Sequence, residues 1–403
     1  MRDLFRKRRM WRQRSELKDS YDVVIIGGGA HGLATAYYLR QQGITDVAVL
    51  EKNYIGSGAA GRNTTILRSN YKTPEGARFY DSSVKLYEGL GAELDFNLLF
   101  SQCGHLTLAH SDRAMFVMAN RAEVNRLQGI DSRLIDPAEV QKLAPAMYVG
   151  EDTTYPIMGA LYHPPGGIIR HDAVVWGLAR GADEGGAEIH PYTEVTGLRR
   201  GGDRIETVET NRGPIRAGTV LNCTAGWSSL VAAMAGIELP ITTHILQACV
   251  TEPVKPFLDV VVVSSQMHVY LSQSDRGEFV MGSEIEPWTT YRTQNTLNFL
   301  QDLSRHTLEL FPQLERARLL RAWAGLCDLS PDYSPILGRT ELDNFHISAG
   351  WGTYGFKADP IVGKTLAELV ATGRTPELIA PFALERFHTD QLVSELAAAA
   401  VSH

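Results

Sequence analysis

The sequence has few cysteines, no excess of positive charge and no long apolar run, and each absence excludes a class of protein. Four cysteines in 403 residues, with no C-x-x-C pair, make neither a disulfide framework nor a zinc site. We therefore expect a reducing compartment and no metal centre. The net charge of −7 argues against a nucleic-acid partner, which would select a basic surface. No apolar run approaches the length of a membrane span, and no period indicates a repeat protein.

The first eighteen residues differ from the rest because they hold a dense run of arginine and lysine. A secretory signal would continue with an apolar core, whereas residues 15–18 are Ser-Glu-Leu-Lys. We therefore expect a cytoplasmic protein that has no membrane contact. Residues 1–20 are interpreted as a basic arm. Two alternatives stay open for this arm, a solvated tail or a segment that lies across an acidic partner subunit and buries Phe5 and Trp11.

A chain of this length predicts two compact domains. The hydrophobic share of 44% and the 37 glycines are typical of an α/β protein with many tight turns.

The stretch at residues 22–33, Asp-Val-Val-Ile-Ile-Gly-Gly-Gly-Ala-His-Gly-Leu, holds the strongest motif of the chain. A buried strand is followed by Gly27, Gly29 and Gly32 in the G-x-G-x-x-G spacing, a helix is predicted over 33–40, and a second strand over 47–50 ends at Glu51. Such a turn directs the free N–H groups of a helix start at a pyrophosphate, and the acid accepts hydrogen bonds from a ribose diol. The motif predicts a dinucleotide fold and by itself does not separate NAD from FAD.

A loop rich in small residues follows at 55–71. Its glycines and alanines allow backbone to approach a flat ligand, and Arg62, Asn63 and Thr64 offer donors to phosphate. Arg68 follows the apolar pair Ile66 and Leu67. An arginine in such a place pairs with a carboxylate, either that of a ligand or that of an internal acid.

The remaining pattern returns twice more to a strand, a glycine turn and a helix, near Thr224 and near Gly350. This predicts a Rossmann-like FAD-binding domain assembled from separated stretches, with an interleaved α+β substrate domain on a mostly antiparallel sheet. The predicted division is 21–100, 168–240 and 322–403 for the FAD-binding domain, and 101–167 and 241–321 for the substrate domain.

Together these motifs resemble the FAD-dependent amine oxidases of the D-amino acid oxidase family, from residue 21 to the last predicted helix. The resemblance rests on the fingerprint, the Gly-Ser-Gly-Ala-Ala-Gly-Arg-Asn loop, Thr-Ala-Gly-Trp, Arg-Ala-Trp-Ala-Gly with Ser-Pro-Asp, and the terminal Gly-Trp-Gly-Thr-Tyr-Gly-Phe-Lys. It implies non-covalent FAD. Besides the residues above, it places these residues at the cofactor: Ala30, His31, Lys52, Val195, Gly350, Gly352, Gly355 and Lys357.

The tract 166–176, Gly-Gly-Ile-Ile-Arg-His-Asp-Ala-Val-Val-Trp, is similar to one subgroup of that family, the β subunits of heterotetrameric sarcosine oxidases. The resemblance implies that His171 is joined covalently to FMN and that Arg170 stabilises the anionic flavin. A histidine that merely caps or packs at a helix start is the alternative. The implied partners are α, γ and δ subunits, and the α subunit is expected to bind NAD and tetrahydrofolate.

The resemblance also implies a substrate clamp. Aligned with the monomeric members of the family, Arg68 and Lys357 hold the carboxylate of sarcosine, and Tyr270 lines the pocket. The monomer's oxygen-activating lysine falls near Val280 and its flavin-linking cysteine near Gly325, two residues from Cys327. The expected reaction is oxidative demethylation of sarcosine at FAD. Electrons then pass to FMN and O₂ to give H₂O₂, and the one-carbon unit goes to tetrahydrofolate.

Two further hypotheses remain. One is a stand-alone FAD-dependent oxidase or dehydrogenase of dimethylglycine, proline or a D-amino acid. The other is a non-catalytic flavin scaffold, against which the retained Arg68 and Lys357 argue.

Overall fold

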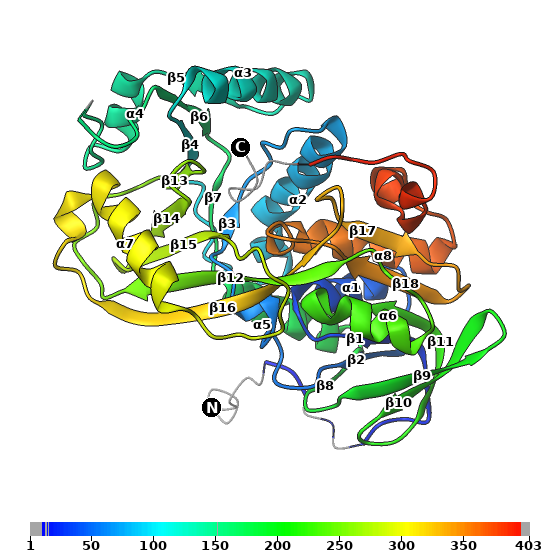
Figure 1. Cartoon of the computed structure of the whole chain (residues 1–403). Helices are drawn as coiled ribbons and strands as arrows, with labels where there is room; N and C mark the ends of the chain where they lie inside the picture. Colours follow the sequence, from blue (N-terminus) through cyan, green and yellow to red (C-terminus); the bar gives the residue numbers. More distant parts are fainter. Residues whose placement is uncertain (1–9, 13, 15, 151, 396–403) are drawn as a thin grey trace.

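The computed structural model describes residues 10–12, 14, 16–150 and 152–395, which form two large sheets with helices packed around them (Figure 1). Much of the predicted basic arm lies outside the described residues. Its described part contacts the first sheet, where Arg14 forms a 3.2 Å ion pair with Glu188. Trp11 packs against the hydrophobic core of the same part of the molecule.

The first sheet grows from the opening strand, and four neighbouring pairs in it are parallel. Its path is β17 (Ile336–Arg339), β18 (Phe345–Ala349), β11 (Ile215–Asn222), β1 (Ser20–Ile26), β2 (Val47–Leu50) and β8 (Glu188–His190). An antiparallel extension of β11 adds β10 (Arg204–Thr210) and β9 (Val195–Gly201). Residues 23–26 of β1 and all of β2 are buried apolar runs, as expected where helices cover both faces of a parallel sheet.

Helices from three distant parts of the chain pack beside this sheet. They are α1 (Ala30–Gln41), α5 (His171–Glu184) and α8 (Asp359–Thr372), with α1 in contact with both others. The long helix α2 (Pro74–Glu93) packs on α8, and the short α6 (Ser228–Met234) lies against β9, β11 and β18. The parts of this domain are therefore separated in sequence, as the repeated glycine turns predict.

The second sheet is antiparallel except for one pair, β13 with β4. Its order is β16 (Leu319–Leu329), β12 (Thr242–Thr251), β15 (Phe279–Ile285), β14 (Val269–Gln273), β13 (Val261–Ser264), β4 (His105–Ala109), β6 (Gly159–His163) and β5 (Arg133–Ile135). Its helices are α3 (Asp112–Leu127), α4 (Pro137–Leu143) and α7 (Leu297–Leu310). The sequence predicts such a mostly antiparallel substrate sheet, and the fold class is confirmed.

Two structural details differ from the sequence-based description. The strand β16 pairs with β12 as far as the Leu329–Thr242 pair, so the second sheet extends past residue 321, where the predicted division ends the substrate domain. Helix α1 begins at Ala30 and not at Leu33, because the helix starts directly after the glycine turn. Among the described residues, no helix combines the length and apolarity that a membrane span requires.

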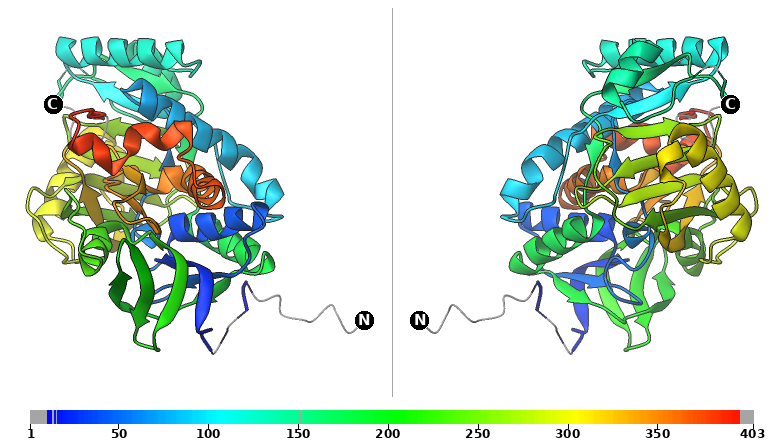
Figure 2. Two further views of the ribbon diagram at one scale, coloured as in Figure 1. Left: turned by 90° about the vertical axis from the view of Figure 1, so that its right-hand side faces the viewer. Right: turned by 90° about the vertical axis from the view of Figure 1, so that its left-hand side faces the viewer.

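The two sheets meet beside a small ribbon of β3 (Ile66–Leu67) and β7 (Gly167–Ile168), which pair antiparallel. Figure 2 shows α3 at one end of the molecule and the β9–β10 hairpin at the opposite end. The region between the two sheets, beside the β3–β7 ribbon, is therefore lined by elements of both domains.

Candidate functional site

The glycine turn after β1 has the geometry of a phosphate-binding site. Gly27 has a φ of 109°, and a Cβ there would lie 2.4 Å from the carbonyl oxygen of Cys223. A Cβ on Gly32 would lie 2.1 Å from the oxygen of Gly27, so the helix packs on the turn through hydrogen atoms alone. At Gly29 no atom lies within 4 Å of a Cβ position. The start of α1 therefore faces open space, which fits a pyrophosphate.

The carboxylate of Glu51 is held in place at the end of β2. Its two oxygens accept backbone hydrogen bonds from Gly28 at 3.0 Å and from Asn53 at 2.9 Å. Oε1 also accepts from the hydroxyl of Ser57 at 3.4 Å, whereas Oε2 keeps a further lone pair with which the group can accept from a ribose hydroxyl.

A cavity of about 580 Å³ runs from this turn to the second sheet. Most of the predicted site residues line it, namely Gly27, Gly29, Ala30, His31, Glu51, Lys52, Arg62, Asn63, Thr64, Arg68, Val195, Tyr270, Gly352, Gly355 and Lys357. Gly32, Gly350, Arg170 and His171 are not among the lining residues. The cavity therefore brings the predicted FAD contacts and the predicted substrate clamp onto one continuous space.

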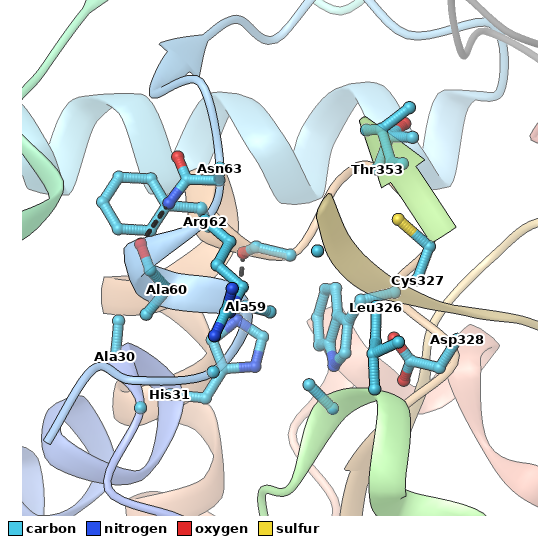
Figure 3. Close-up of a pocket in the computed structure, with 18 of the residues that line it drawn as sticks. Ala30, His31, Ala59, Ala60, Arg62, Asn63, Leu326, Cys327, Asp328 and Thr353 are labelled. Atoms are coloured by element: carbon cyan, nitrogen blue, oxygen red, sulfur yellow. Dashed lines mark hydrogen bonds between the residues drawn. The ribbon is translucent and has the colours of Figure 1, made fainter. Parts of the chain in front are cut away.

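The loop that follows β2 forms one wall of the cavity (Figure 3). The side-chain amide of Asn63 donates to the carbonyl of Ala60 and its oxygen accepts from the N–H of Thr65 at 2.7 Å. Arg62 donates through Nε to the carbonyl of Ser57 at 3.2 Å. These two side chains, predicted as phosphate donors, hold the shape of the loop, and Thr65 adopts a φ of 61° there.

His31 joins α1 to the C-terminal glycine turn. Its Nε2 lies 2.9 Å from the carbonyl of Gly355, and its Nδ1 lies 3.0 Å from the hydroxyl of Ser348. Burial lowers the pKa of His31 to about 4, so the ring is neutral near pH 7. The carbonyl requires an N–H donor, which places the proton on Nε2.

Asp328 was not singled out from the sequence, but it lies on the cavity wall at β16 (Figure 3). Its Oδ2 accepts a 2.6 Å hydrogen bond from the N–H of Gly350, and its carbonyl accepts from Gly352 at 2.8 Å. Burial raises the pKa of Asp328 to about 7. Gly350 therefore supports the site through Asp328. The neighbouring Cys327 is a thiol whose pKa burial raises to about 12.

Arg68 and Lys357 are both buried on the cavity wall, at 7% and 9% exposure. Arg68 donates through Nη1 to the side-chain oxygen of Asn70 at 3.0 Å, and its guanidinium lies 4.4 Å from the ring centre of Tyr71. Lys357 donates to the carbonyl of Thr353 at 3.0 Å. Burial, and then the charge of Arg68, lower the pKa of Lys357 to about 7. Holding two basic groups out of water beside one cavity is costly, and an anionic ligand would offset that cost.

Tyr270 lies on β14 with 7% exposure, and its hydroxyl crosses to the neighbouring strand. A Cβ on Gly282 would lie 2.1 Å from that hydroxyl oxygen, so the glycine makes room for it. Burial raises the pKa of Tyr270, which keeps the phenol protonated. Tyr270 is among the residues that line the cavity.

His171 is the first residue of α5 and is separate from the cavity. Thr65, on the cavity wall, accepts a 3.1 Å backbone hydrogen bond from Ile169, two residues before His171. Burial lowers the pKa of His171, which favours the neutral, nucleophilic imidazole. The guanidinium of Arg170 bonds both oxygens of Asp172, at 3.3 and 3.0 Å.

The sequence-based reasoning missed Arg121 and His105, which also line the cavity. Arg121 lies on α3, and a charged residue on a helix is normally expected to face solvent. A signal was present, since Met118, Arg121, Ala122 and Asn125 follow the spacing of one helix face and are all buried.

The fold and the cavity define a flavin-dependent oxidoreductase of the D-amino acid oxidase type. The family described as "DAO: FAD dependent oxidoreductase" matches residues 22–369, and the chain belongs to this family. Its members bind FAD, for which the glycine turn, Glu51 and the cavity are suited.

Among known proteins, the chain is similar to the sarcosine oxidase β subunits. It is 46% identical to the subunit from Arthrobacter sp., covering 96% of both chains. It is 47% identical to the one from Rhizobium meliloti (strain 1021), covering 96% of this chain and 92% of the other. The structure of L-proline dehydrogenase from P. horikoshii is similar at a TM-score of 0.88 with 32% identity, covering 94% and 100% of the two chains. Glycine oxidase from Geobacillus kaustophilus, at a TM-score of 0.83 and 22% identity, shares the fold.

Proposed function

We propose that this chain is the catalytic β subunit of a sarcosine oxidase and oxidises the N-methyl group of sarcosine in the cavity. The observation that carries the proposal is the position of Arg68 and Lys357, which are buried on the same cavity as the dinucleotide-binding turn. The likeness to sarcosine oxidase β subunits over 96% of the chain supports the choice of substrate.

The residues at one end of the cavity fit the adenosine diphosphate part of FAD. Gly27, Gly29 and the first turn of α1 would hold the pyrophosphate, and Glu51 the ribose. Bound FAD would supply the two-electron acceptor, a chemistry that no side chain provides. Thr64, Gly352 and Gly355 also line the cavity, and the two glycines leave room beside them for a flat ring.

At the other end, Arg68 and Lys357 bind and orient the substrate. Arg68 offers a planar fork to the carboxylate, and Lys357 adds a point charge. Fixing the carboxylate at two points sets the direction of the amine and its methyl group, which reduces the entropy cost of reaching the reactive geometry. Tyr270 lines the same cavity and is buried, so a substrate bound beside it would be partly shielded from bulk water.

We further propose that His171 holds FMN covalently and that the chain works with α, γ and δ subunits. The half-buried imidazole with a lowered pKa supports this assignment. The backbone hydrogen bond from Ile169, two residues before His171, to Thr65 on the cavity wall supports electron transfer between the two sites. FMN would pass the electrons to oxygen. The α subunit would transfer the one-carbon unit to tetrahydrofolate and would bind NAD. All four cysteines are free thiols, which supports a cytoplasmic location.

The test of the substrate is anaerobic addition of sarcosine to the FAD-loaded protein. We expect the visible flavin absorbance to bleach, and we expect Arg68→Met to raise the sarcosine concentration required. Absence of bleaching would refute the catalytic role and favour a flavin scaffold.

The covalent flavin needs a separate experiment on partner-bound protein. Acid precipitation should give a yellow pellet, and the mass of FMN should appear on the peptide that contains His171. A colourless pellet would contradict the assignment, and His171→Ala is the matched control.

L-Proline is the second candidate substrate, favoured by the 32% identity to L-proline dehydrogenase over 94% of this chain. Proline and sarcosine are both secondary amines with an α-carboxylate, so one clamp serves both. The rate of flavin reduction by each, at equal concentration, decides between them.

A further inference from the structure

A second buried guanidinium lies next to the proposed substrate clamp. Arg121 reaches the cavity from α3, and it is 6% exposed. Its Nη2 donates to the side-chain oxygen of Asn70 at 3.0 Å, and that oxygen also accepts from Arg68 at 3.0 Å. Its Nε donates to the backbone carbonyl of Asn70. Two guanidinium groups from different parts of the chain therefore converge on one residue.

This arrangement places more positive charge on the cavity than one carboxylate requires. Burial and the charge of Arg68 lower the pKa of Arg121 to about 9, which reflects the cost of holding like charges together. Glu395 is the acid that acts on Arg121. Its carboxylate already accepts from the backbone of Lys72 and Thr73, at distances from 3.0 to 3.2 Å. The hydrogen bonds of the Glu395 carboxylate therefore stabilise the turn that leads into α2.

Hydrogen-bonding groups at this end are left unused within the described part of the chain. The hydrogen bonds of Arg121 to described residues use Nε and Nη2, which leaves Nη1 for a ligand. His105, which is 2% exposed and lines the same cavity, has an Nδ1 without a described partner. Buried polar atoms without partners are costly, and a ligand that supplies acceptors relieves that cost.

We propose that Arg121 is a second anion anchor and that this cavity accepts ligands with two carboxylates. Arg68 and Lys357 bind one carboxylate, and Arg121 binds the other through Nη1. The class includes small dicarboxylates and secondary amino acids whose nitrogen bears a carboxymethyl group. This inference rests on the proposed function, which locates the first carboxylate at Arg68 and Lys357. It adds a second carboxylate site, which a substrate with one carboxylate would leave empty.

The experiment compares acetate with malonate as unreactive ligands of the FAD-loaded holoprotein, by titration of the visible flavin spectrum. In the wild type we expect malonate to bind more tightly than acetate. Arg121→Gln should weaken malonate binding by about tenfold or more, from the loss of one charged hydrogen bond, and change acetate binding by less than about threefold. Arg126→Gln is the matched control, because Arg126 stands on the same helix, exposed and paired with Glu123.

Equal weakening of both ligands by Arg121→Gln would overturn the proposal and reduce Arg121 to a residue that positions Arg68. An unchanged malonate affinity would overturn it as well. If Arg121→Gln does not fold, the wild type and Arg121→Lys remain informative, since equal affinity for the two ligands in the wild type refutes a second anchor. Sarcosine-dependent bleaching is measured separately, so failure of the proposed function and failure of this inference give different results.

Discussion

The charge state of Lys357 makes the affinity of the cavity for carboxylates depend on pH. Burial, and next the charge of Arg68, lower the pKa of Lys357 to about 7 in the ligand-free protein. The group is an ammonium below that value and a neutral amine above it. A bound carboxylate favours the ammonium, so affinity is greatest below pH 7 and falls as the pH rises through the pKa.

The size of the effect follows from the interaction that is lost. A hydrogen bond between charged groups contributes about 1.5–3 kcal/mol, which corresponds to about a 10- to 150-fold change in dissociation constant. The limiting slope is about tenfold per pH unit, so most of the change should fall between about pH 7 and pH 9. Asp328, whose pKa is about 7, gains negative charge over the same range and also weakens anion binding. The Lys357→Met variant separates the two contributions.

The assay is titration of the FAD-loaded protein with acetate at about pH 6, 7, 8 and 9, followed by the flavin spectrum. Acetate is suitable because it stays ionised throughout and has no amine that titrates. The wild type should lose affinity as the pH rises. Lys357→Met should bind acetate weakly at every pH and retain only the shallower dependence that Asp328 produces. Equal affinity of the wild type at pH 6 and pH 9, or an identical pH profile in Lys357→Met, would refute the reasoning.

Four further predictions concern stability and cofactor binding. Gly27→Ala should lower the free energy of unfolding by more than about 2 kcal/mol, because its φ is positive and backbone fills the Cβ position. Gly29→Ala should leave that free energy within about 0.5 kcal/mol and weaken FAD binding, which urea unfolding of the apoprotein and fluorescence titration measure. Arg386→Met should cost about 3–5 kcal/mol, because it strands the buried carboxylate of Asp332, and adding Asp332→Asn should restore part of the loss. The wild type should gain stability as the pH rises from about 7 to about 10, since the unfolded chain keeps a proton on Lys357 that the folded chain releases, and Lys357→Met should lack this part of the slope.

Local patterns in the sequence predicted the α/β fold class and its mostly antiparallel substrate sheet. Strand runs, glycine spacing and helix periodicity are short-range signals, and the strand predicted over 47–50 matches β2. Helix starts were less well placed. Helix α1 begins at Ala30, directly after the glycine turn, whereas the pattern predicted a helix over 33–40.

The sequence by itself determined the dinucleotide turn and the residue types of the clamp, because G-x-G-x-x-G and its flanking strand and helix lie within one short segment. The tertiary structure decided what shares the cavity with them. Arg121 and Asp328 come from elements far along the chain, and only sheet pairing and helix packing bring them to the wall that Arg68 and Lys357 occupy. Burial is likewise a property of the folded chain, and it is burial that shifts the pKa values of Lys357 and Asp328 to about 7.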